Sequence, residues 1–370
     1  MHLSYWEHKS WFSQVDYTVV GSGIVGLHAA LRLRERFPQA KILVLEKGVL
    51  PEGASTKNAG FACFGSLSEL LDDLRSHSEN EVINLVHQRW NGLQLLRKNL
   101  GDAAIDFTPH GGYELFLQSD ANSYANCLAR MPFINDLFRP FFKADVFLKE
   151  YNRFGFQGLC DQLIFNPFEA QIDTGKMMQA LLKKAISQDI LILNQQEVLG
   201  YTETNSQVEI QLLDFSFATQ KLFFATNSFA SQLLDVPVQP GRAQVLVTEP
   251  IPNLTIKGTF HLDQGYYYFR NIDDRILLGG GRNLDFVGET TTDLGQTDLI
   301  QNRLEELLKE VILPQQDVKV ARRWSGIMGL GAHKNPIVEQ LSNRVYCGVR
   351  LGGMGVAIGS LIGAELADLA

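Results

Sequence analysis

The sequence feature that most constrains the fold is a glycine-rich turn between an apolar strand and a helix. Residues 17–20 form a short apolar run of the kind found in buried parallel strands. Residues 21–26 then have the pattern G-x-G-x-x-G, and apolar residues at helical spacing follow until Pro38 ends the helix. A second predicted strand, residues 41–45, leads directly to Glu46. This order, with an acid about 20 residues after the glycines, predicts a dinucleotide-binding βαβ unit.

The glycines and the acid have separate roles in such a unit. Gly21 permits a tight turn, Gly23 lets the backbone approach a diphosphate, and Gly26 lets the helix pack against the strand. The N–H groups and the dipole at the start of the helix stabilise the negative diphosphate. Glu46 can accept hydrogen bonds from both ribose hydroxyls, although a surface acid after a tight turn is the simpler alternative. The cofactor contacts predicted here are Gly21, Ser22, Gly23, Ile24, Gly26, Glu46 and Lys47.

A loop of small residues follows Glu46 and bears on the choice between NAD and FAD, which the glycine pattern serves equally. Residues 53–60 offer hydroxyl and backbone N–H groups that can lie against a large flat cofactor. An ordinary glycine-rich surface loop explains this segment equally well when it is taken alone. The candidate cofactor contacts in the loop are Ser55, Thr56, Lys57, Asn58, Ala59 and Gly60.

Composition and charge argue against several other classes of protein. The net charge of −8 disfavours binding to nucleic acid or to anionic membranes. The chain has no apolar run of about 18 residues, so no membrane span is expected, and residues 1–15 do not have the pattern of a signal peptide. The four cysteines lie far apart without a CxxC, and the histidines have no metal-ligand spacing. We therefore expect a cytoplasmic protein with reduced thiols and no metal.

Several motifs in a fixed order carry a resemblance to a known family. They lie at residues 21–26, Glu46, and residues 55–60, 225–227, 324–326 and 348–355. This ordered set resembles the D-amino-acid oxidase family of FAD-dependent oxidoreductases, which includes glycine and sarcosine oxidases and gamma-glutamylputrescine oxidases. The resemblance covers nearly the whole chain, and it implies that the dinucleotide is FAD.

The expected fold is α/β (α+β overall), because helices and strands alternate at both ends of the chain while residues 236–320 are mostly strands. It comprises a Rossmann-like FAD-binding domain, discontinuous in sequence, and a mostly antiparallel β substrate domain with helices. The predicted FAD-binding domain consists of residues 1–82, 169–235 and 321–370, and the substrate domain consists of residues 83–168 and 236–320.

The resemblance also implies further cofactor contacts. The backbone of Val198 would meet the adenine, and residues 225–227 would pass near the diphosphate. Residues 352–356 would contact the pyrimidine end of the flavin, where the positive end of the following helix would stabilise a reduced flavin. These additional candidates are Val198, Ala225, Thr226, Asn227, Trp324, Gly326, Gly352, Gly353, Met354, Gly355 and Val356.

The chain departs from the usual residues of the family at three positions. Met354 replaces a histidine in the C-terminal glycine motif. Met328 stands where amino-acid oxidases have an arginine that binds the substrate carboxylate. Met328 also lies in the segment that aligns with the cysteine to which some relatives attach the flavin covalently, so non-covalent FAD is expected here. Leu277 stands closest to a lysine that promotes reaction with oxygen in sarcosine oxidases. These departures weaken the expectation of a small amino-acid substrate and of oxygen as the electron acceptor.

The densest aromatic and basic cluster supplies the candidate substrate site. Tyr266, Tyr268 and Arg270 share one face if they lie on a strand, and an arginine between two tyrosine hydroxyls can bind a carboxylate by a forked contact. An aromatic core face with a snorkelling arginine is the structural alternative. The side chain of Lys57 is predicted to lie beside the flavin, and a lysine in a solvent-exposed loop is the alternative. The candidate catalytic residues are Tyr266, Tyr268, Arg270 and Lys57.

The predicted function is an FAD-dependent oxidoreductase that oxidises a C–N bond of an amine or amino acid by hydride transfer to flavin N5. Three alternatives remain open at this point: an enzyme for a larger amine conjugate or modified base, a non-catalytic FAD-binding protein, and an NAD-dependent dehydrogenase. The expected partner is a small-molecule substrate, with no nucleic acid and no membrane span, and the oligomeric state is not predicted.

Overall fold

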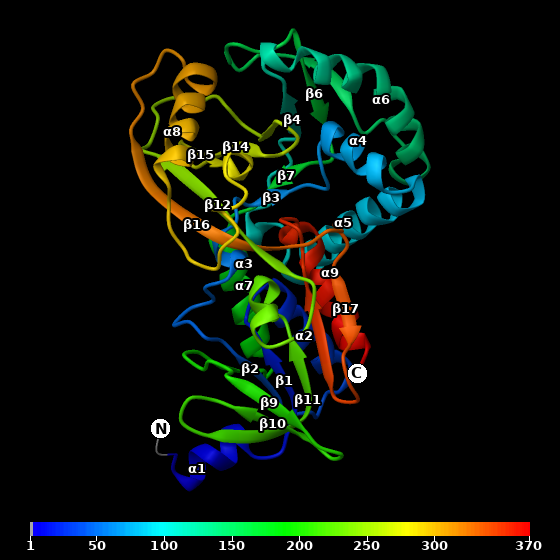
Figure 1. Cartoon of the computed structure of the whole chain (residues 1–370), viewed down its shortest axis with the longest axis vertical. Coiled ribbons are helices and arrows are strands. Elements are labelled where there is room, and N and C mark those ends of the chain that lie inside the picture. Colours follow the sequence, from blue (N-terminus) through cyan, green and yellow to red (C-terminus); the bar gives the residue numbers. More distant parts are fainter. Residues whose placement is uncertain (1–2) are drawn as a thin grey trace.

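The computed structural model describes residues 3–370, which form two lobes, one above the other in Figure 1. The first lobe, at the bottom of that view, is built on an eight-stranded sheet with the order β17-β18-β11-β1-β2-β8, and β10 and β9 extend it from β11. Its strands are β1 (Val15–Val20), β2 (Ile42–Leu45), β8 (Leu191–Leu193), β9 (Gly200–Glu203), β10 (Val208–Gln211), β11 (Ser216–Phe224), β17 (Ile337–Gln340) and β18 (Val345–Val349).

The central strands of the first lobe are apolar because both faces of the sheet are covered. β1 runs parallel to β2 and β11, and β11 runs parallel to β18. Parallel neighbours need crossover connections, which are usually helical. The helices α2 (Ile24–Arg36) and α7 (Thr174–Ser187) lie in such connections, and together with the C-terminal helix α9 (Gly355–Asp368) they cover one face. The β9–β10 hairpin packs on the other face. Gly363 brings α9 against α2, since a Cβ there would lie 2.5 Å from the Val25 carbonyl oxygen.

The second lobe contains another eight-stranded sheet, with the order β16-β12-β15-β14-β13-β4-β6-β5. All of its neighbouring strands are antiparallel except β13 and β4, which are parallel. Its strands are β4 (Gly112–Leu115), β5 (Leu148–Tyr151), β6 (Gln162–Asn166), β12 (Gln239–Thr248), β13 (Thr259–Leu262), β14 (Tyr267–Ile272), β15 (Arg275–Gly280) and β16 (Val320–Leu330).

The two faces of this second sheet differ in chemistry. The outer face is apolar and aromatic: Phe260 and Phe269 stack with ring centroids 4.5 Å apart, and the helix α8 (Asp298–Leu307) buries Ile300 and Leu304 against the same cluster. The inner face carries polar and small residues and is turned toward the first lobe. Alternation of side chains along each strand produces this division.

Three further helices flank the inner face, on the right of Figure 1. They are α4 (Leu67–Ser76), α5 (Glu79–Leu100) and α6 (Ala121–Phe142). α4 and α5 both begin with a capping box, formed by Ser66 with Glu69 and by Ser78 with Glu81, in which each side chain bonds the backbone N–H of the other residue. Among residues 3–370, no helix is both long and apolar enough to cross a bilayer.

The remaining elements are short. A two-stranded sheet between the lobes pairs β3 with β7. The full set of short elements is α1 (Tyr5–Glu7), η1 (His8–Phe12), α3 (Ala54–Lys57), β3 (Phe61–Ala62), η2 (Ala103–Ile105), η3 (Gln118–Asp120), β7 (Ala170–Gln171), η4 (Asn227–Gln232), η5 (Arg282–Leu284) and η6 (Leu308–Ile312).

The predicted α/β class is confirmed, including the opening strand–helix–strand unit and the mostly antiparallel second sheet. The division into two domains stays a prediction. The structure adds one detail to it: β16 pairs along its length with β12 in the second sheet, so the predicted boundary at residue 321 falls at the beginning of a strand of that sheet.

Candidate functional site

The glycine-rich turn joins the end of β1 to the start of α2. Gly21 has φ +102°, and a Cβ there would lie 2.8 Å from the Ala225 carbonyl oxygen. A Cβ on Gly26 would collide with the carbonyl oxygen of Gly21. Gly23 is the N-cap of α2. The turn therefore excludes side chains, and it leaves the start of the helix open to a close ligand.

The small-residue loop lies at this same helix start. Ser55 Oγ accepts a hydrogen bond of 2.9 Å from the backbone N–H of Ile24, and a Cβ on Gly23 would lie 2.8 Å from that hydroxyl. A polar oxygen thus already lies at the N-terminal start of α2, where a phosphate oxygen is favourable. Residues 21–26 and 55–60 were predicted as separate motifs, and in the structure they are in contact.

Hydrogen bonds within the loop fix its shape. Asn58 donates its Nδ2–H to the Ser55 carbonyl at 2.8 Å, and its Oδ1 accepts the N–H of Gly60 at 2.9 Å. The hydroxyl of Thr56 donates to the Pro51 carbonyl at 2.7 Å. Ala59 is buried and belongs to an apolar cluster with Leu277. The loop therefore presents ordered backbone toward the second lobe.

Glu46 is held in place at the end of β2. One carboxylate oxygen accepts the backbone N–H of Ser22 at 3.1 Å and its hydroxyl at 2.7 Å, and the other accepts the N–H of Gly48 at 3.1 Å. Each carboxylate oxygen has two lone pairs, so one acceptor position remains, on the oxygen bonded to Gly48. An acid oriented in this way beside the glycine turn is suited to the hydroxyls of an adenosine ribose.

The two remaining residues predicted near the adenosine lie on either side of Glu46. Lys47 is exposed, and its ammonium pairs with the Glu197 carboxylate at 2.7 Å. Val198 is buried in the core of the first lobe, two residues after Gln196, whose N–H donates to the Glu46 carbonyl at 2.8 Å. The backbone near Val198 is thus beside Glu46 as expected, whereas the side chain of Lys47 is engaged with Glu197.

Residues 225–227 lie at the carboxyl end of β11, beside Gly21. The hydroxyl oxygen of Thr226 is buried and has no hydrogen-bond partner among residues 3–370. Asn227 has φ +47°, and its Oδ1 accepts the N–H groups of Arg350 at 3.1 Å and Leu351 at 3.3 Å. An unsatisfied buried hydroxyl calls for a polar partner. A cofactor diphosphate at the glycine turn would supply that partner.

The C-terminal glycine motif forms a turn before α9. Gly352 and Gly353 have φ +58° and +82°, and Met354 is the N-cap of the helix. A Cβ on Gly353 would lie 3.3 Å from the Met328 sulfur, so Met328 is next to this turn. Gly355 and Val356 form the first turn of α9. These residues fit the pyrimidine end of a flavin, because the helix start offers N–H groups and positive dipole charge.

The inner face of the second sheet aligns six residues in one row across six strands. Register places them opposite one another in the order Glu114, His261, Tyr268, Gly279, Val245 and Trp324. At one end the indole N–H of Trp324 donates to the Lys57 carbonyl at 2.9 Å. In the middle Tyr268 packs edge-on against Phe61, with ring centroids 5.6 Å apart. The row therefore faces the loop that carries the flavin candidates.

Tyr268 is a suitable group for orienting a ligand in this row. It is half-buried, and burial raises the pKa of its phenol to about 12, so the hydroxyl stays protonated and can donate or accept a hydrogen bond. Gly279 lies opposite, where a Cβ would come within 2.8 Å of the Tyr268 hydroxyl. The missing side chain at position 279 thus allows the Tyr268 ring to lie against β15, because a side chain there would collide with the ring.

The expectation that Arg270 binds a substrate carboxylate needs correction. Its side chain is on the inner face, but the guanidinium donates to the backbone carbonyls of Ala59, of Ile172 at 2.9 Å and of Asn271 at 3.3 Å. Burial lowers the pKa of this group to about 10. Because its donors are directed at main-chain oxygens of the first lobe's loops, Arg270 braces the junction between the lobes.

Tyr266 and Lys57 also differ from expectation. Tyr266 precedes β14, so it does not share the face of Tyr268, and its ring packs edge-on against Phe286 with centroids 5.9 Å apart. Lys57 ends α3, and its Cβ would lie 3.1 Å from a Cβ on Gly326. The backbone and side-chain stem of Lys57 therefore contact Gly326 and Trp324 on β16. Of the four candidates, Tyr268 is the one whose side chain lies free on the inner face.

The sequence did not single out a buried acid–base group at the other end of the row. His261 Nε2 and Glu169 Oε2 are 2.8 Å apart, and Thr259 donates its hydroxyl to the same oxygen at 2.9 Å. Burial lowers the pKa of His261, but the charge and hydrogen bond of Glu169 outweigh it and raise the pKa to about 9. His261 also contacts Phe61, with centroids 5.3 Å apart. The pair is thus a protonated imidazole on a carboxylate.

Glu114 lies opposite His261 on β4 and extends this polar end. Its carboxylate accepts hydrogen bonds from Ser66 Oγ at 3.0 Å and from both the N–H and the hydroxyl of Ser68. Burial raises the pKa of Glu114 to about 7, although the bonds from Ser68 oppose that shift. No strand was predicted around His261, so its position opposite Glu114 emerges only from the pairing of β13 with β4.

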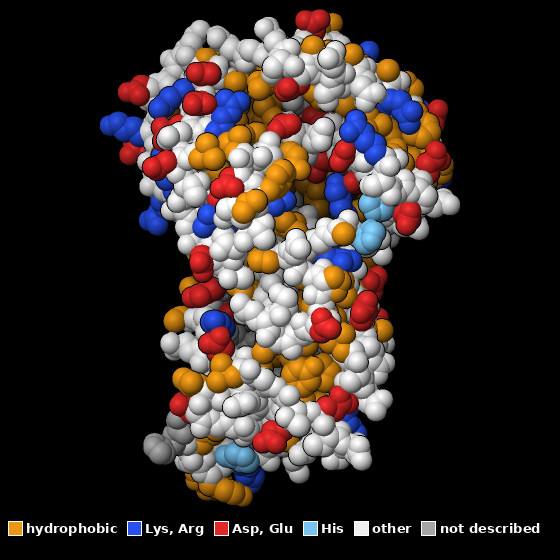
Figure 2. Space-filling model, viewed as in Figure 1, with side chains coloured by type: hydrophobic (Ala, Val, Ile, Leu, Met, Phe, Trp, Pro, Cys, Tyr) orange, Lys and Arg blue, Asp and Glu red, His pale blue; other side chains and the backbone are white. Residues whose placement is uncertain are grey.

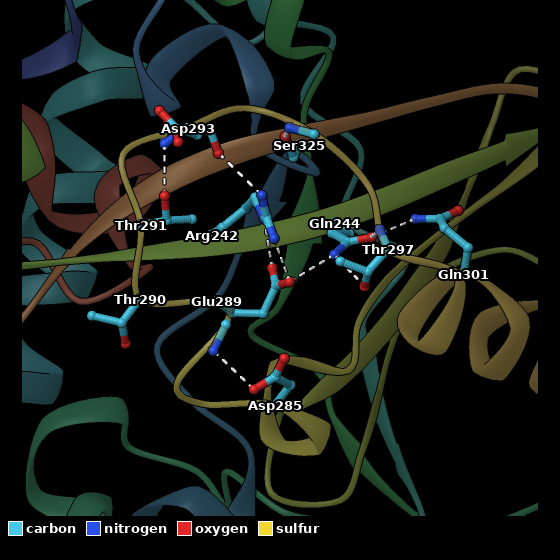
Figure 3. Close-up of polar contacts among 12 residues, drawn as sticks. Arg242, Gln244, Asp285, Glu289, Thr290, Thr291, Asp293, Thr297, Gln301 and Ser325 are labelled. Atoms are coloured by element: carbon cyan, nitrogen blue, oxygen red, sulfur yellow. Dashed lines mark hydrogen bonds and ion pairs between the residues drawn. The ribbon is translucent and has the colours of Figure 1, made fainter.

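A loop after β15 is tied to the strands beside the site (Figure 3). Arg242 and Glu289 form a forked ion pair with distances of 2.9 and 2.8 Å, and the Glu289 side chain is fully buried. Gln244 donates to Glu289 at 3.0 Å and accepts the N–H of Thr297 at 3.0 Å. This network holds residues 285–297 across β12 on the outer face of the second sheet, opposite the face that carries Val245.

The surface is hollowed above the junction of the lobes. Figure 2 shows this hollow in the upper part of the molecule, between the region of β14 and β15 and the helices α4 and α5, with charged side chains around it. The inner row of the second sheet and the β3–β7 pair lie in that part of the fold. The hollow is therefore on the side of the molecule where the second sheet meets these helices.

Comparisons with known proteins agree with this arrangement. The sequence model described as FAD dependent oxidoreductase matches residues 16–369. The chain is 21% identical over 386 residues to the probable oxidoreductase OrdL of Haemophilus influenzae, covering 95% of this chain and 82% of that protein.

Solved structures show the same fold. L-proline dehydrogenase from P. horikoshii has a TM-score of 0.76 at 18% identity, with 96% of this chain and 93% of that chain covered. Glycine oxidase from Geobacillus kaustophilus has a TM-score of 0.77 at 17% identity, with 96% and 94% covered. Together with the match over residues 16–369, the glycine turn, Glu46 and the C-terminal turn establish that this chain belongs to the family of FAD-dependent oxidoreductases.

Proposed function

We propose that this FAD-dependent oxidoreductase oxidises a C–N bond of an amine or amino acid held between the flavin and the inner face of the second sheet. The observation that carries the proposal is the row from Glu114 to Trp324, which faces the loop of residues 55–60. Bound FAD supplies the hydride acceptor at flavin N5. The protein then has to orient the substrate, keep its amine neutral and exclude water.

The residues of the row suit these tasks. The Tyr268 hydroxyl, which stays protonated, can bond the amine or a neighbouring polar group of the substrate. Leu277, Val245 and Ala59 form an apolar cluster beside it, which keeps water away from the reacting carbon. The residues at the start of α2 and α9 would hold the cofactor non-covalently at its diphosphate and pyrimidine ends.

Anaerobic flavin reduction tests the proposal. Purified protein with bound FAD is mixed with a panel of amines and amino acids, and loss of flavin absorbance is followed. We expect at least one amine to bleach the flavin, and Tyr268→Phe to slow bleaching by about tenfold, the effect of one lost hydrogen bond. Tyr201→Phe, a half-buried tyrosine in the first lobe, is the matched control and should not change the rate.

A protein that is reduced by dithionite but by no amine in the panel would contradict the proposal. That outcome would favour the non-catalytic FAD-binding role. Failure of the protein to bind FAD at all would instead contradict the assignment of the cofactor residues, so the two failures are distinguishable.

A larger amine is a second candidate substrate, and a specific observation favours it. The position that holds a carboxylate-binding arginine in amino-acid oxidases is Met328, and the guanidinium of Arg270 is engaged by three backbone carbonyls. Recognition of a free α-carboxylate therefore lacks the usual forked partner. Slow bleaching by glycine, sarcosine and D-alanine with fast bleaching by an amine conjugate would support this candidate, and the reverse order would exclude it.

A further inference from the structure

We propose that Cys63, Glu169 and His261 form a buried binding site for a zinc-type divalent cation at the edge of the inner row. One candidate ligand atom from each residue, the sulfur of Cys63, a carboxylate oxygen of Glu169 and a ring nitrogen of His261, lies within 4.8 Å of the other two. All three residues are buried, with 5%, 1% and 5% of their surfaces exposed. His261 also belongs to the inner row, so this site adjoins the wall on which the proposed function rests, but metal binding is measured separately from flavin reduction.

The fold brings the three ligands together from distant parts of the chain. β3 and β7 pair so that Phe61 lies opposite Gln171 and Ala62 lies opposite Ala170. The next residues in that antiparallel register are Cys63 and Glu169, which therefore face each other across the end of the pair. His261 comes from β13 of the second sheet and already contacts Glu169 at 2.8 Å.

The donor set and its spacing suit zinc. Zn²⁺ takes thiolate, imidazole and carboxylate ligands at about 2.0–2.3 Å, which separates neighbouring ligand atoms by about 3.3–3.8 Å in a tetrahedral site. The ion would replace the direct contact between His261 and Glu169. The two ligand atoms that are farthest apart would have to approach each other by up to about 1 Å. Three protein ligands leave a fourth position for water or another donor.

Neighbouring groups already orient the carboxylate. Thr259 donates its hydroxyl to Glu169 Oε2 at 2.9 Å, and Asn166 donates its Nδ2–H to Oε1 at 3.5 Å. Outer hydrogen bonds of this kind fix ligand geometry in metal sites and increase metal affinity. A thiol and a protonated imidazole must lose their protons when the ion binds, so the loading is best done at about pH 8.

A surface pocket lies beside this region. It has a volume of about 250 Å³, and Phe168, Glu169 and Ala170 line it together with Trp90, Arg97 and Pro167. Glu169 is only 1% exposed, so the pocket ends next to the buried cluster and does not open into it.

Zinc content tests the site directly. The FAD-bound protein is treated with a chelator, loaded with zinc chloride, desalted and measured for zinc and FAD per chain. We expect about one zinc per chain in the wild type and less than about a fifth of that in Cys63→Ser, a nearly isosteric change. Cys127→Ser is the matched control: that cysteine is also buried, with 1% exposed, but it lies on α6 outside the cluster. Its zinc content should equal that of the wild type.

The melting temperature is a second measurement, and it distinguishes loss of the zinc site from misfolding of a variant. Zinc should raise the melting temperature of the wild type in a way that the chelator reverses, because a ligand that binds only the folded state stabilises it. Glu169→Gln should reduce this shift. Wild-type protein that retains no zinc and shows no shift, or Cys63→Ser protein that retains its zinc, would overturn the proposal.

Discussion

The indole N–H of Trp324 donates a hydrogen bond of 2.9 Å to the backbone carbonyl of Lys57, a residue 267 positions away. Trp324 lies on β16 of the second sheet, and Lys57 ends α3 in the loop that carries the cofactor candidates. Two residues beyond Trp324, Gly326 permits the approach, since a Cβ there would lie 3.1 Å from the Lys57 Cβ. This bond ties β16 of the second sheet to the loop that carries the cofactor candidates.

Trp324→Phe should therefore loosen the junction of the lobes. The replacement keeps an aromatic ring in the cluster with Ala59 and Leu277 but leaves the Lys57 carbonyl without its donor. We expect the free energy of unfolding in urea to fall by about 1–3 kcal/mol. The control is Trp6→Phe, because Trp6 is 70% exposed, and its effect should stay within about 0.5 kcal/mol. Equal effects of the two changes would contradict a structural role for the Trp324 bond.

Thr226→Val should weaken FAD binding without destabilising the protein that lacks FAD. The Thr226 hydroxyl is buried without a partner among residues 3–370, so its removal costs no hydrogen bond within the chain. If the diphosphate bonds this hydroxyl, the dissociation constant for FAD should rise about tenfold, measured by equilibrium dialysis.

Thr18→Val supplies the matched control for this change. Thr18 is on β1 and its hydroxyl is likewise buried without a partner in residues 3–370. It lies within the strand, before the glycine turn, so FAD affinity should be unchanged. A fall in affinity for Thr18→Val as large as that for Thr226→Val would mean that the effect is one of packing.

Much of the cofactor site was predictable because its signals are local. The strand, the G-x-G-x-x-G turn and the acid at the next strand end lie within residues 17–46, and the backbone conformations they require depend on neighbouring residues. The structure shows why: Gly21 needs its positive φ, and Gly26 has no room for a Cβ.

The inner row of the second sheet was less predictable because it depends on pairing between distant strands. Alternation correctly put Tyr268 and Arg270 on one face, but it does not say what that face meets. The partners of Arg270 are carbonyls of Ala59 and Ile172, far away in the sequence. The contact of His261 with Glu169 spans 92 positions, and no spacing rule for metal ligands covers such a distance.

Glu289→Gln should destabilise the protein more than an equivalent change at the surface. The Glu289 side chain is fully buried and accepts three donors, two from Arg242 and one from Gln244. Removal of one partner of a buried pair leaves the other charge uncompensated, which typically costs about 3–5 kcal/mol. Urea unfolding measures the loss.

The comparison for this prediction is Glu306→Gln. Glu306 pairs with Arg303 at 3.1 Å on α8, where both side chains are substantially exposed. Pairs of this kind contribute about 0–1 kcal/mol. A loss at Glu289 no greater than that at Glu306 would show that the loop of residues 285–297 is not anchored by the ion pair.

Acid should destabilise the first lobe through His28, which is buried on α2. Burial is the main cause that lowers the pKa of His28 to about 4, and Nδ1 lies 2.8 Å from the Ile24 carbonyl oxygen. A histidine whose folded pKa is below its unfolded value of about 6.5 favours folding fully above pH 6.5 and loses that contribution as the pH falls through 4. The shift corresponds to about 3 kcal/mol.

His28→Leu should flatten this part of the stability curve, in which the free energy of unfolding is measured between pH 7 and 4. Replacement of the exposed His8 in the same way should leave the curve unchanged, and a curve for His28→Leu as steep as the wild type would assign the acid sensitivity to other groups.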